Sequence, residues 1–381
     1  MIPYGKHLVD EDDIDAVVDV LRNQFLTQGK VVPQFEQALC NYTGAKYCVA
    51  VNSATSGLHV ACLAAGVGTG DLVWTVPNSF VASANCALYC GASIDFVDIN
   101  PTTRNIDVSA LENKLQQAAS QNRLPKVLIV VHFSGLSCDM QSIRSLTQKY
   151  SIVLIEDAAH GLGGSYQQSK IGSCVYADMA VLSFHPVKSI TSAEGGAVLT
   201  NQSGLHEKLK LFAKHGVTKD PEQYQGESHG PWYYQQLELG YNYRLSDMQA
   251  ALGLSQLKKL DSFMQKRAEI AKVYDEALVN LPLKLPVVES QSQSAWHLYM
   301  VELTLHDRQD IYQQLHAKGV GVNVHYIPIH LQPYYQQLGF KQGDFPVSEH
   351  FYQHALTLPL FPSLTDEEQT KVIDTLREIL V

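Results

Sequence analysis

The sequence lacks most features that would tie it to a membrane or to nucleic acid. Charged residues make up only 17% of the chain, with 38 acidic against 28 basic side chains and a formal net charge of −10. No long block of lysine or arginine is present, which argues against nucleic acid or an anionic membrane surface as the main partner. Apolar runs such as 127–133 are far shorter than the roughly 18 residues of a membrane-spanning helix. Since the N-terminus also lacks a signal-peptide pattern, we expect a cytoplasmic protein that acts on small molecules.

The cysteines and histidines form no pattern typical of a disulfide framework or a metal site. The seven cysteines are odd in number, and none are spaced Cys-x-x-Cys. Cys86 and Cys90 lie one helical turn apart, where burial explains them better than redox or metal chemistry. A metal hydrolase built on His132, His160 and His185 lacks the helical spacing that such sites use. We therefore expect free, buried thiols and no metal.

Two common nucleotide-binding motifs are also missing. The chain has no Gly-x-x-x-x-Gly-Lys-Ser/Thr loop. The glycines at 66–70 end a helical stretch and precede a strand, which is the reverse of the order in a dinucleotide-binding turn. The sequence therefore argues against NAD-dependent chemistry, because the glycine-rich segment that most resembles a dinucleotide-binding turn has the wrong order of elements.

What the chain does contain is a regular series of short apolar runs rich in branched residues. They lie at residues 47–51, 72–76, 94–97, 127–132, 152–155, 179–182 and 196–200. The run at 127–131 is continuously apolar, as expected for a strand whose two sheet faces are both covered by helices. The sequence therefore predicts an α/β core with a mostly parallel, seven-stranded sheet.

The remainder of the chain predicts a second, smaller unit. Segment 246–249 (Ser-Asp-Met-Gln) has the form of a capping box and opens a long helical pattern. A strand at 298–303, a helix at 309–318 and a strand at 320–326 follow. We predict a large α/β domain over residues 1–250 and a small C-terminal α+β domain over residues 251–381.

Polar residues follow the predicted strand at 152–155. Glu156, Asp157 and His160 lie just past its carboxyl end, the edge at which open α/β sheets bind ligands. A carboxylate held there among apolar neighbours needs a cationic partner. Asp157 could equally cap a turn or a helix, since aspartate is common at such positions.

A lysine follows another strand end, 31 residues after Asp157. Lys188 comes after the strand at 179–182 and before the pair Gly195-Gly196, which permits a close approach of the backbone. A lysine placed there can form a Schiff base with a carbonyl group when burial favours its neutral form. Most lysines are solvated surface residues, so the position past a strand end makes this one a candidate.

Segment 52–57 (Asn-Ser-Ala-Thr-Ser-Gly) lies between the first predicted strand and a helical stretch. Such a turn presents backbone N–H groups and hydroxyls to an anion such as phosphate, although a plain helix cap by Ser53 or Thr55 is the simpler alternative. Phe80 also lies past a strand, where it can stack on a planar ring or pack in the core. An anion-binding turn, a strand-end aspartate and a strand-end lysine are together what pyridoxal 5'-phosphate (PLP) needs.

These features, in this order, resemble the DegT/DnrJ/EryC1/StrS family of PLP-dependent sugar aminotransferases over nearly the whole chain. The matching segments are residues 25–29, 51–56, 156–160, 183–188, 193–196 and 240–247. The resemblance implies the type I fold of PLP-dependent transferases, pyridoxal 5'-phosphate as the cofactor, and a homodimer whose active sites are shared between subunits.

The resemblance also implies roles for individual residues. Lys188 forms the Schiff base with the cofactor and moves the proton, Asp157 keeps the ring nitrogen protonated, and His160 lies near the ring. Phe80 stacks on the ring. The residues implied to hold the phosphate are Ala54, Thr55, Ser183 and, from the neighbouring subunit, Asn242. The residues implied to lie in substrate-contacting regions are Tyr4, Gln24, Phe25, Leu26, Thr27, His325 and Tyr326.

Within the family, residues 2–4, 183–188 and 324–329 are most similar to enzymes of pseudaminic-acid biosynthesis. These enzymes aminate C4 of UDP-2-acetamido-2,6-dideoxy-β-L-arabino-hexos-4-ulose with L-glutamate as the donor. We expect the same reaction of this chain. Residues 218–239 look longer than the corresponding loop of such enzymes.

Other functions remain open from the sequence. One is amination of a different nucleotide-linked ketosugar at C3 or C4. Another is sugar dehydration, but the family's dehydratases carry histidine where this chain has Lys188. A third is a non-enzymatic regulator that binds the cofactor or a sugar, which the presence of both Lys188 and Asp157 disfavours.

Overall fold

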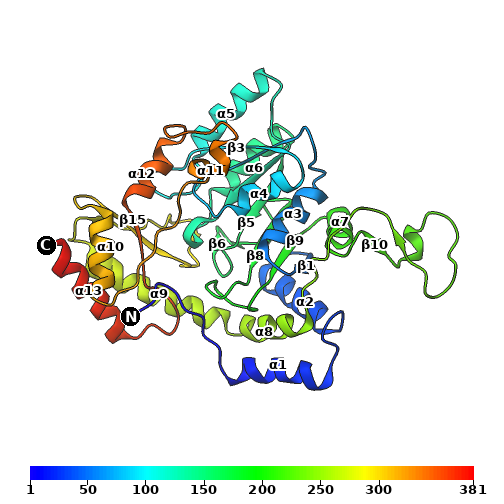
Figure 1. The fold of residues 1–381 in the computed structure, drawn as a ribbon, viewed down its shortest axis with the longest axis horizontal. Coiled ribbons are helices and arrows are strands. Elements are labelled where there is room, and N and C mark those ends of the chain that lie inside the picture. The colour runs from blue at the N-terminus through cyan, green and yellow to red at the C-terminus, as the bar shows by residue number, and fades with distance from the viewer.

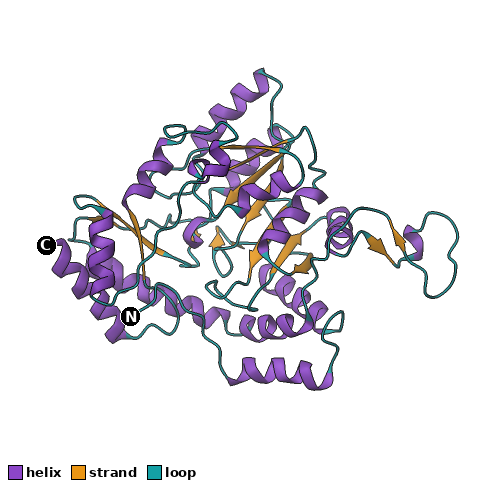
Figure 2. Cartoon of the chain, in the orientation of Figure 1, coloured by secondary structure: helices purple, strands orange, loops and turns teal.

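The computed structural model describes residues 1–381, with a seven-stranded sheet at its centre (Figures 1 and 2). The strands of this sheet are β1 (Tyr47–Val51), β2 (Leu72–Thr75), β3 (Ser93–Phe96), β4 (Val127–Val131), β5 (Val153–Asp157), β8 (Met179–Ser183) and β9 (Gly196–Thr200). Their order across the sheet is β1-β9-β8-β5-β4-β2-β3. The seven strands predicted from the sequence are confirmed, with ends that shift by one or two residues.

One strand runs against the other six. β9 pairs antiparallel with both β1 and β8, whereas β8, β5, β4, β2 and β3 pair in parallel. The carboxyl ends of β1, β2, β4, β5 and β8 therefore meet at one edge of the sheet, together with the first residue of β9. The predicted ligand-binding edge is this one.

Helices cover both faces of the sheet. α3 (Ala54–Ala64), α4 (Ala82–Tyr89) and α7 (Ser203–Ala213) cover one face, and α2 (Val31–Thr43), α5 (Val108–Ser120), α6 (Met140–Lys149) and α8 (Asp247–Leu257) cover the other. On β4, Val127 and Ile129 pack under α3 and α4, whereas Leu128 and Val130 pack under α5 and α6. This alternation explains why the strand is apolar at every position, since burying each such side chain contributes about 1.5–3 kcal/mol.

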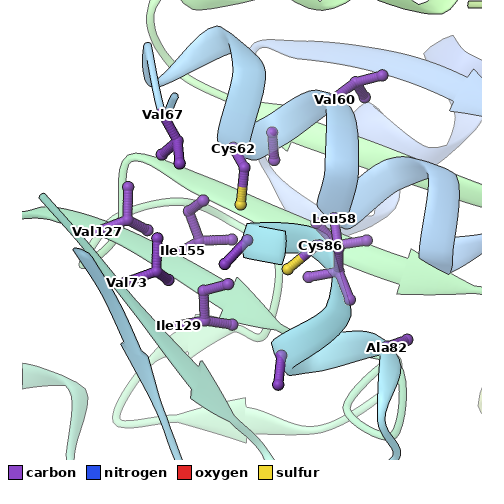
Figure 3. Close-up of a cluster of buried hydrophobic side chains, with 14 of the residues drawn as sticks. Leu58, Val60, Cys62, Val67, Val73, Ala82, Cys86, Val127, Ile129 and Ile155 are labelled. Atoms are coloured by element: carbon purple, nitrogen blue, oxygen red, sulfur yellow. The ribbon is translucent and has the colours of Figure 1, made fainter. Parts of the chain in front are cut away.

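Figure 3 shows part of the apolar core between the sheet and helices α3, α4 and α7. Cys62 of α3 and Cys86 of α4 lie in it above the strands that carry Val127, Ile129 and Ile155. All seven cysteines of the chain are free, and six of them are buried. The prediction of free, buried thiols is confirmed.

The helices begin where the sequence supplies a capping side chain. Asp107 and Asp139 cap α5 and α6 through backbone N–H groups three residues ahead. Ser246 and Gln249 form the predicted capping box at the start of α8. The long helical pattern that follows is divided, because residues 258–259 form a turn before α9 (Leu260–Leu278) begins.

A second, three-stranded sheet follows in the last third of the chain. It consists of β12 (Leu283–Lys284), β14 (Tyr299–Leu303) and β15 (Ala355–Leu358), with α10 (Arg308–Ala317) and α13 (Asp366–Leu380) packed nearby. The predicted strand at 298–303 and helix at 309–318 correspond to β14 and α10. The division into domains at residue 250 stays a prediction, and α9 contributes Leu260 to the core of α8 and Ile270 to the core of this second sheet.

The predicted strand at 320–326 was wrong. This segment makes only two isolated bridges, Ile2 with Val320 and Asn323 with Thr357. Its branched apolar residues favour an extended backbone, but beyond the bridge at Asn323 the segment runs along a cavity and does not continue a ladder with β15.

The remaining elements are short or lie at the periphery. They are α1 (Glu11–Asn23), β6 (Ser165–Tyr166), β7 (Ser169–Lys170), β10 (Val217–Thr218), β11 (Gln235–Gln236), β13 (Ser292–Gln293), α11 (Pro333–Gln336) and α12 (Pro346–His354). Figure 1 shows the segment that carries β10 projecting away from the body. Among all the helices, none has both the length and the apolar composition needed to cross a membrane.

Candidate active site

A cavity of about 480 Å³ opens at the edge where β1, β5 and β8 end. Small-molecule sites have volumes of roughly 300–1,000 Å³. Ten of the fifteen predicted site residues line this cavity, and they come from segments far apart in the chain. They are Tyr4, Ala54, Thr55, Phe80, Asp157, His160, Ser183, Lys188, His325 and Tyr326.

Lys188 reaches the cavity from the turn between β8 and β9. Its backbone N–H donates to the carbonyl oxygen of His185 at 2.9 Å, and its side chain is the only lysine or arginine side chain in the cavity wall. Burial lowers the pKa of the Lys188 amine to about 8, against the opposing effect of the Asp157 charge. The amine is therefore neutral at near-neutral pH far more often than an ordinary lysine, as a nucleophile or a base must be.

Asp157 is the last residue of β5, with an exposed fraction of 5%. Oδ2 of its carboxylate accepts a hydrogen bond from the Ser83 hydroxyl at 2.6 Å, and Oδ1 accepts one from the Ala159 N–H at 3.2 Å. Burial raises the pKa of this carboxyl, while the two hydrogen bonds and the charge of Lys188 lower it. The Asp157 carboxylate and the Lys188 amine thus face the same cavity, and they carry opposite charges when both are ionised.

Three buried histidines and a tyrosine form one wall of the cavity. The ring centroids of His160 and His297 are 4.3 Å apart, and the Tyr326 hydroxyl lies 3.3 Å from Nε2 of His160. Burial lowers the pKa of His325 to about 3 and holds the pKa values of His160 and His297 well below their usual range. This wall is therefore neutral. Nδ1 of His160 and Nδ1 of His297 have no hydrogen-bond partner in the chain.

The neutral histidines make the stability of the protein sensitive to acid. A histidine with a lowered pKa takes up its proton only on unfolding, so its contribution to stability is present above its unfolded pKa of about 6.5 and is lost as the pH falls. Each one adds up to about 1.4 kcal/mol per pH unit to the slope of the unfolding free energy. We expect His297→Gln to reduce this slope below pH 6 by up to about 1.4 kcal/mol per pH unit, which corresponds to one proton fewer taken up on unfolding. Urea unfolding at several pH values measures the slope. An unchanged slope would mean that His297 is protonated in the folded protein.

The turn between β1 and α3 presents unpaired donors to the same cavity. Ser53 caps α3 by accepting a hydrogen bond from the Ser56 N–H at 3.1 Å. The N–H groups of Ala54 and Thr55, at the first helical positions, have no partner inside the helix and favour an anion. A Cβ added to Gly196 would lie 2.6 Å from the nitrogen of Ala54. The close backbone approach expected at the glycine pair is therefore present, and it places β9 directly against this turn.

Residues 7–377 match the model of the DegT/DnrJ/EryC1/StrS aminotransferase family. The chain belongs to this family. It is therefore a transaminase, in a family whose aminotransferases use pyridoxal phosphate.

Individual members of the family are similar to this chain over their full length. The UDP-4-amino-4,6-dideoxy-N-acetyl-beta-L-altrosamine transaminase of Campylobacter jejuni serotype O:2 is 39% identical, covering 100% of this chain and 98% of its own. The structure of PseC from Helicobacter pylori, an aminotransferase involved in the biosynthesis of pseudoaminic acid, has a TM-score of 0.90 at 35% identity and covers 100% and 99%. The putative sugar aminotransferase Spr1654 from Streptococcus pneumoniae, in its PMP form, has a TM-score of 0.91 at 29% identity, with coverage of 100% and 99%. Spr1654 is also known in a PLP form.

Five residues that the family resemblance implies do not line the cavity of the single chain. Gln24, Phe25, Leu26 and Thr27 lie in the turn between α1 and α2, which is held by a hydrogen bond from the Asp247 N–H to the Leu26 carbonyl oxygen at 2.9 Å. Asn242 is exposed and lies beside the β1–α3 turn, where Asn52 donates to its carbonyl oxygen. The roles of these five residues stay predictions.

Sequence reasoning missed several residues of the cavity wall, among them Ser83, His297 and Asn323. Ser83 is hydrogen-bonded to Asp157, the ring of His297 packs at a tilt of 38° against that of His160, and Nδ2 of Asn323 lies 3.4 Å from Nε2 of His325. The sequence contained one indication for Ser83: it lies four residues after Ser79, in the segment that carries Phe80, so that the two serines can lie on the same side of a helical turn. No local pattern distinguishes His297, because it precedes β14 in an apolar stretch that resembles any core strand.

Proposed function

We propose that this aminotransferase uses pyridoxal 5'-phosphate to move an amino group from L-glutamate to C4 of UDP-2-acetamido-2,6-dideoxy-β-L-arabino-hexos-4-ulose. The product is UDP-4-amino-4,6-dideoxy-N-acetyl-β-L-altrosamine. The observation that carries the chemistry is the placement of the Lys188 amine and the Asp157 carboxylate in one cavity, at the ends of the neighbouring strands β8 and β5. The choice of sugar is supported by the 39% identical relative that is named for this product.

The residues of the cavity fit the cofactor group by group. The unpaired N–H groups of Ala54 and Thr55 suit its phosphate, and the Phe80 ring, 58% exposed at the cavity wall, suits stacking on its ring. Asp157 suits the ring nitrogen. The partnerless Nδ1 of His160 is a buried polar atom that a ligand would satisfy. When bound, PLP supplies a cationic ring that accepts the electrons released as a proton leaves the amine-bearing carbon.

The chain's own residues then move and hold protons. Lys188 takes the α-proton from glutamate and later delivers a proton to C4 of the sugar, because its lowered pKa allows it to act as both base and acid near neutral pH. Asp157 holds a proton on the ring nitrogen through its charge. The neutral histidine wall offers hydrogen bonds to polar substrate groups without placing another cation beside Lys188.

We further propose a homodimer with shared active sites. Lys188 is the only lysine or arginine in the cavity wall, although both glutamate and a UDP-sugar carry negative charges. Phe25, Trp232 and Leu239 are 79%, 75% and 78% exposed, and each is a large apolar side chain that a second copy can cover. Asn242 and the turn at 24–27 lie outside the cavity of their own chain, so we assign their contacts with cofactor or substrate to the cavity of a neighbouring chain.

A heterodimer tests this arrangement. In a dimer of one Lys188→Ala chain and one Asn242→Ala chain, shared sites leave one of the two sites with both residues intact. We expect such a heterodimer, purified through two different tags, to have about half of wild-type activity, whereas each homodimer of a single variant has far less. Activity no higher than that of the Asn242→Ala homodimer would mean that each site is built from one chain.

The proposed reaction is tested by spectroscopy and product analysis. The purified protein is expected to absorb visible light when loaded with PLP, and to lose this absorption when L-glutamate is added in the absence of sugar. Adding the UDP-4-ketosugar should restore the absorption and yield a product whose new amine is at C4, located by NMR. A protein that stays colourless after PLP is supplied would remove the cofactor, and amination of only a different ketosugar would replace the substrate.

A further inference from the structure

Two serines connect Asp157 to the start of helix α4. The Ser83 hydroxyl lies 2.6 Å from Oδ2 of Asp157, and the Ser79 hydroxyl lies 2.7 Å from that of Ser83. Ser79, Ser83 and Asp157 are 5%, 1% and 5% exposed. This row of polar side chains is therefore almost completely buried, and it borders the cavity.

The direction of the hydrogen bonds follows from the number of protons. An ionised carboxylate can only accept hydrogen bonds, so Ser83 gives its single hydroxyl proton to Asp157. Ser83 then has only lone pairs to offer, and Ser79 must be the donor between the two serines. Each bond polarises the next one, so that the pair is a stronger donor to the carboxylate than Ser83 alone.

The charge of Asp157 depends on a small number of groups. Burial is the largest influence on its pKa and raises it, and the Ser83 hydroxyl is the largest opposing influence, ahead of the Ala159 N–H and the charge of Lys188. The remaining ionisable group that acts on Asp157 is His132, which is hydrogen-bonded to Glu156. In the proposed function the Lys188 amine is bound to the cofactor. Among the groups of the chain itself, Ser83 is then the main one left to favour the charged form of Asp157.

Helix α4 links this hydrogen bond to the surface that receives the cofactor ring. The Ser83 N–H donates to the carbonyl oxygen of Phe80 at 3.2 Å, so the aromatic ring at the cavity wall and the donor to Asp157 belong to one backbone turn. The same backbone turn therefore positions Phe80, proposed to stack on the cofactor ring, and Ser83, which donates to the carboxylate proposed to meet the ring nitrogen.

We propose that Ser83, assisted by Ser79, is a positioning residue that keeps Asp157 charged and turns its free lone pairs toward the ring nitrogen of the cofactor. The proposal rests on the proposed function, because it concerns the partner of that nitrogen. Neither serine touches the reacting carbon atoms in this arrangement. Their effect is transmitted through Asp157.

The test is the pH dependence of cofactor affinity in Ser83→Ala. Without the hydroxyl, less opposes the effect of burial on the pKa of Asp157, so this carboxyl stays neutral up to a higher pH. The acid limb, which is the fall in PLP affinity at low pH, therefore moves toward alkaline pH. We expect a movement of about one pH unit and a roughly tenfold weaker affinity at pH 6, with affinity recovering as the pH rises. PLP binding to the apoprotein is measured by fluorescence quenching, and kcat and KM for glutamate are measured in parallel. We expect kcat to fall with little change in KM.

Three further variants make the result specific. Ser83→Thr retains the hydroxyl and should restore the wild-type acid limb, while Ser79→Ala should move it in the same direction by less. Ser348→Ala is a matched control, because Ser348 is also buried and donates to a carboxylate, that of Asp98 at 2.8 Å, outside the cavity. If Ser83→Ala does not fold, Ser79→Ala gives the same readout.

The outcomes separate this proposal from the proposed function. A wild-type acid limb in both Ser83→Ala and Ser79→Ala, with normal PLP binding by the wild-type protein, would overturn the role of the serines and leave the transamination intact. A parallel loss of affinity at every pH would also overturn it, because it would indicate a purely structural effect. Failure of the wild-type protein to bind PLP would remove the proposed function itself.

Discussion

Lys188→Ala is expected to lower kcat by at least about 10⁴-fold, the upper end of the range for losing a general acid–base group. The loss is this large because, in the proposed function, one amine serves both as the attachment point for the cofactor and as the carrier of the proton. Stopped-flow absorbance after mixing with glutamate measures the half-reaction directly, without a contribution from product release. Substantial steady-state turnover by the variant would contradict the assignment.

Two comparisons separate chemistry from folding in this experiment. Lys188→Arg keeps a positive charge but cannot lose its proton near neutral pH, so it should be as inactive as the alanine variant. Lys272→Ala removes a lysine whose side chain is 78% exposed on α9 and should retain full activity. The side chain of Lys188 makes no hydrogen bond in the chain, so its removal should leave the thermal unfolding temperature near that of the wild type. A large fall in that temperature would assign part of the lost activity to unfolding.

The sequence was informative wherever a local pattern and the global fold have the same cause. Segment 127–131 is apolar at every position because β4 is covered on both faces, and Ser246 starts α8 because its hydroxyl caps the helix. Asp157 and Lys188 could be singled out because parallel strands bring their carboxyl ends to one edge, although 31 residues separate them. The candidate site was therefore predictable to the extent that it is built from strand ends.

The sequence did not predict strand pairing or side-chain contacts between segments that are far apart in the chain. The branched residues at 320–326 have the composition of a strand, but nothing local shows that they meet β15 only at the single bridge between Asn323 and Thr357. His297 enters the cavity wall only because the turn before β14 packs against His160, a contact between residues more than 130 positions apart. Asn242 and the turn at 24–27 lie outside the cavity of one chain, and their contact with cofactor or substrate stays a proposal.

Asp157→Asn is expected to lower kcat by more than about 10²-fold while the protein retains some cofactor. An amide is neutral and cannot stabilise a proton on the ring nitrogen by charge, so the ring accepts electrons less well when the proton leaves the substrate carbon. The remaining contacts that hold the cofactor, the N–H groups of the β1–α3 turn and the attachment to Lys188, are unchanged. Absorbance of the loaded variant and single-turnover rates with glutamate measure the two quantities separately.

The same substitution should not destabilise the apoprotein, and this contrast is the stricter test of the role of Asp157. The amide can accept the Ala159 N–H through Oδ1 and donate to the Ser83 hydroxyl through Nδ2, so both hydrogen-bond positions stay filled. Because burial raises the folded pKa of Asp157 above its unfolded value, its contribution to stability is present at acid pH and lost as the pH rises through the folded pKa. At pH 7 the charged carboxylate is a cost to the empty protein, and the asparagine variant should unfold at the same or a higher urea concentration. Near-normal turnover, or a loss of activity that parallels a loss of stability, would mean that Asp157 is a structural residue and not the partner of the cofactor ring.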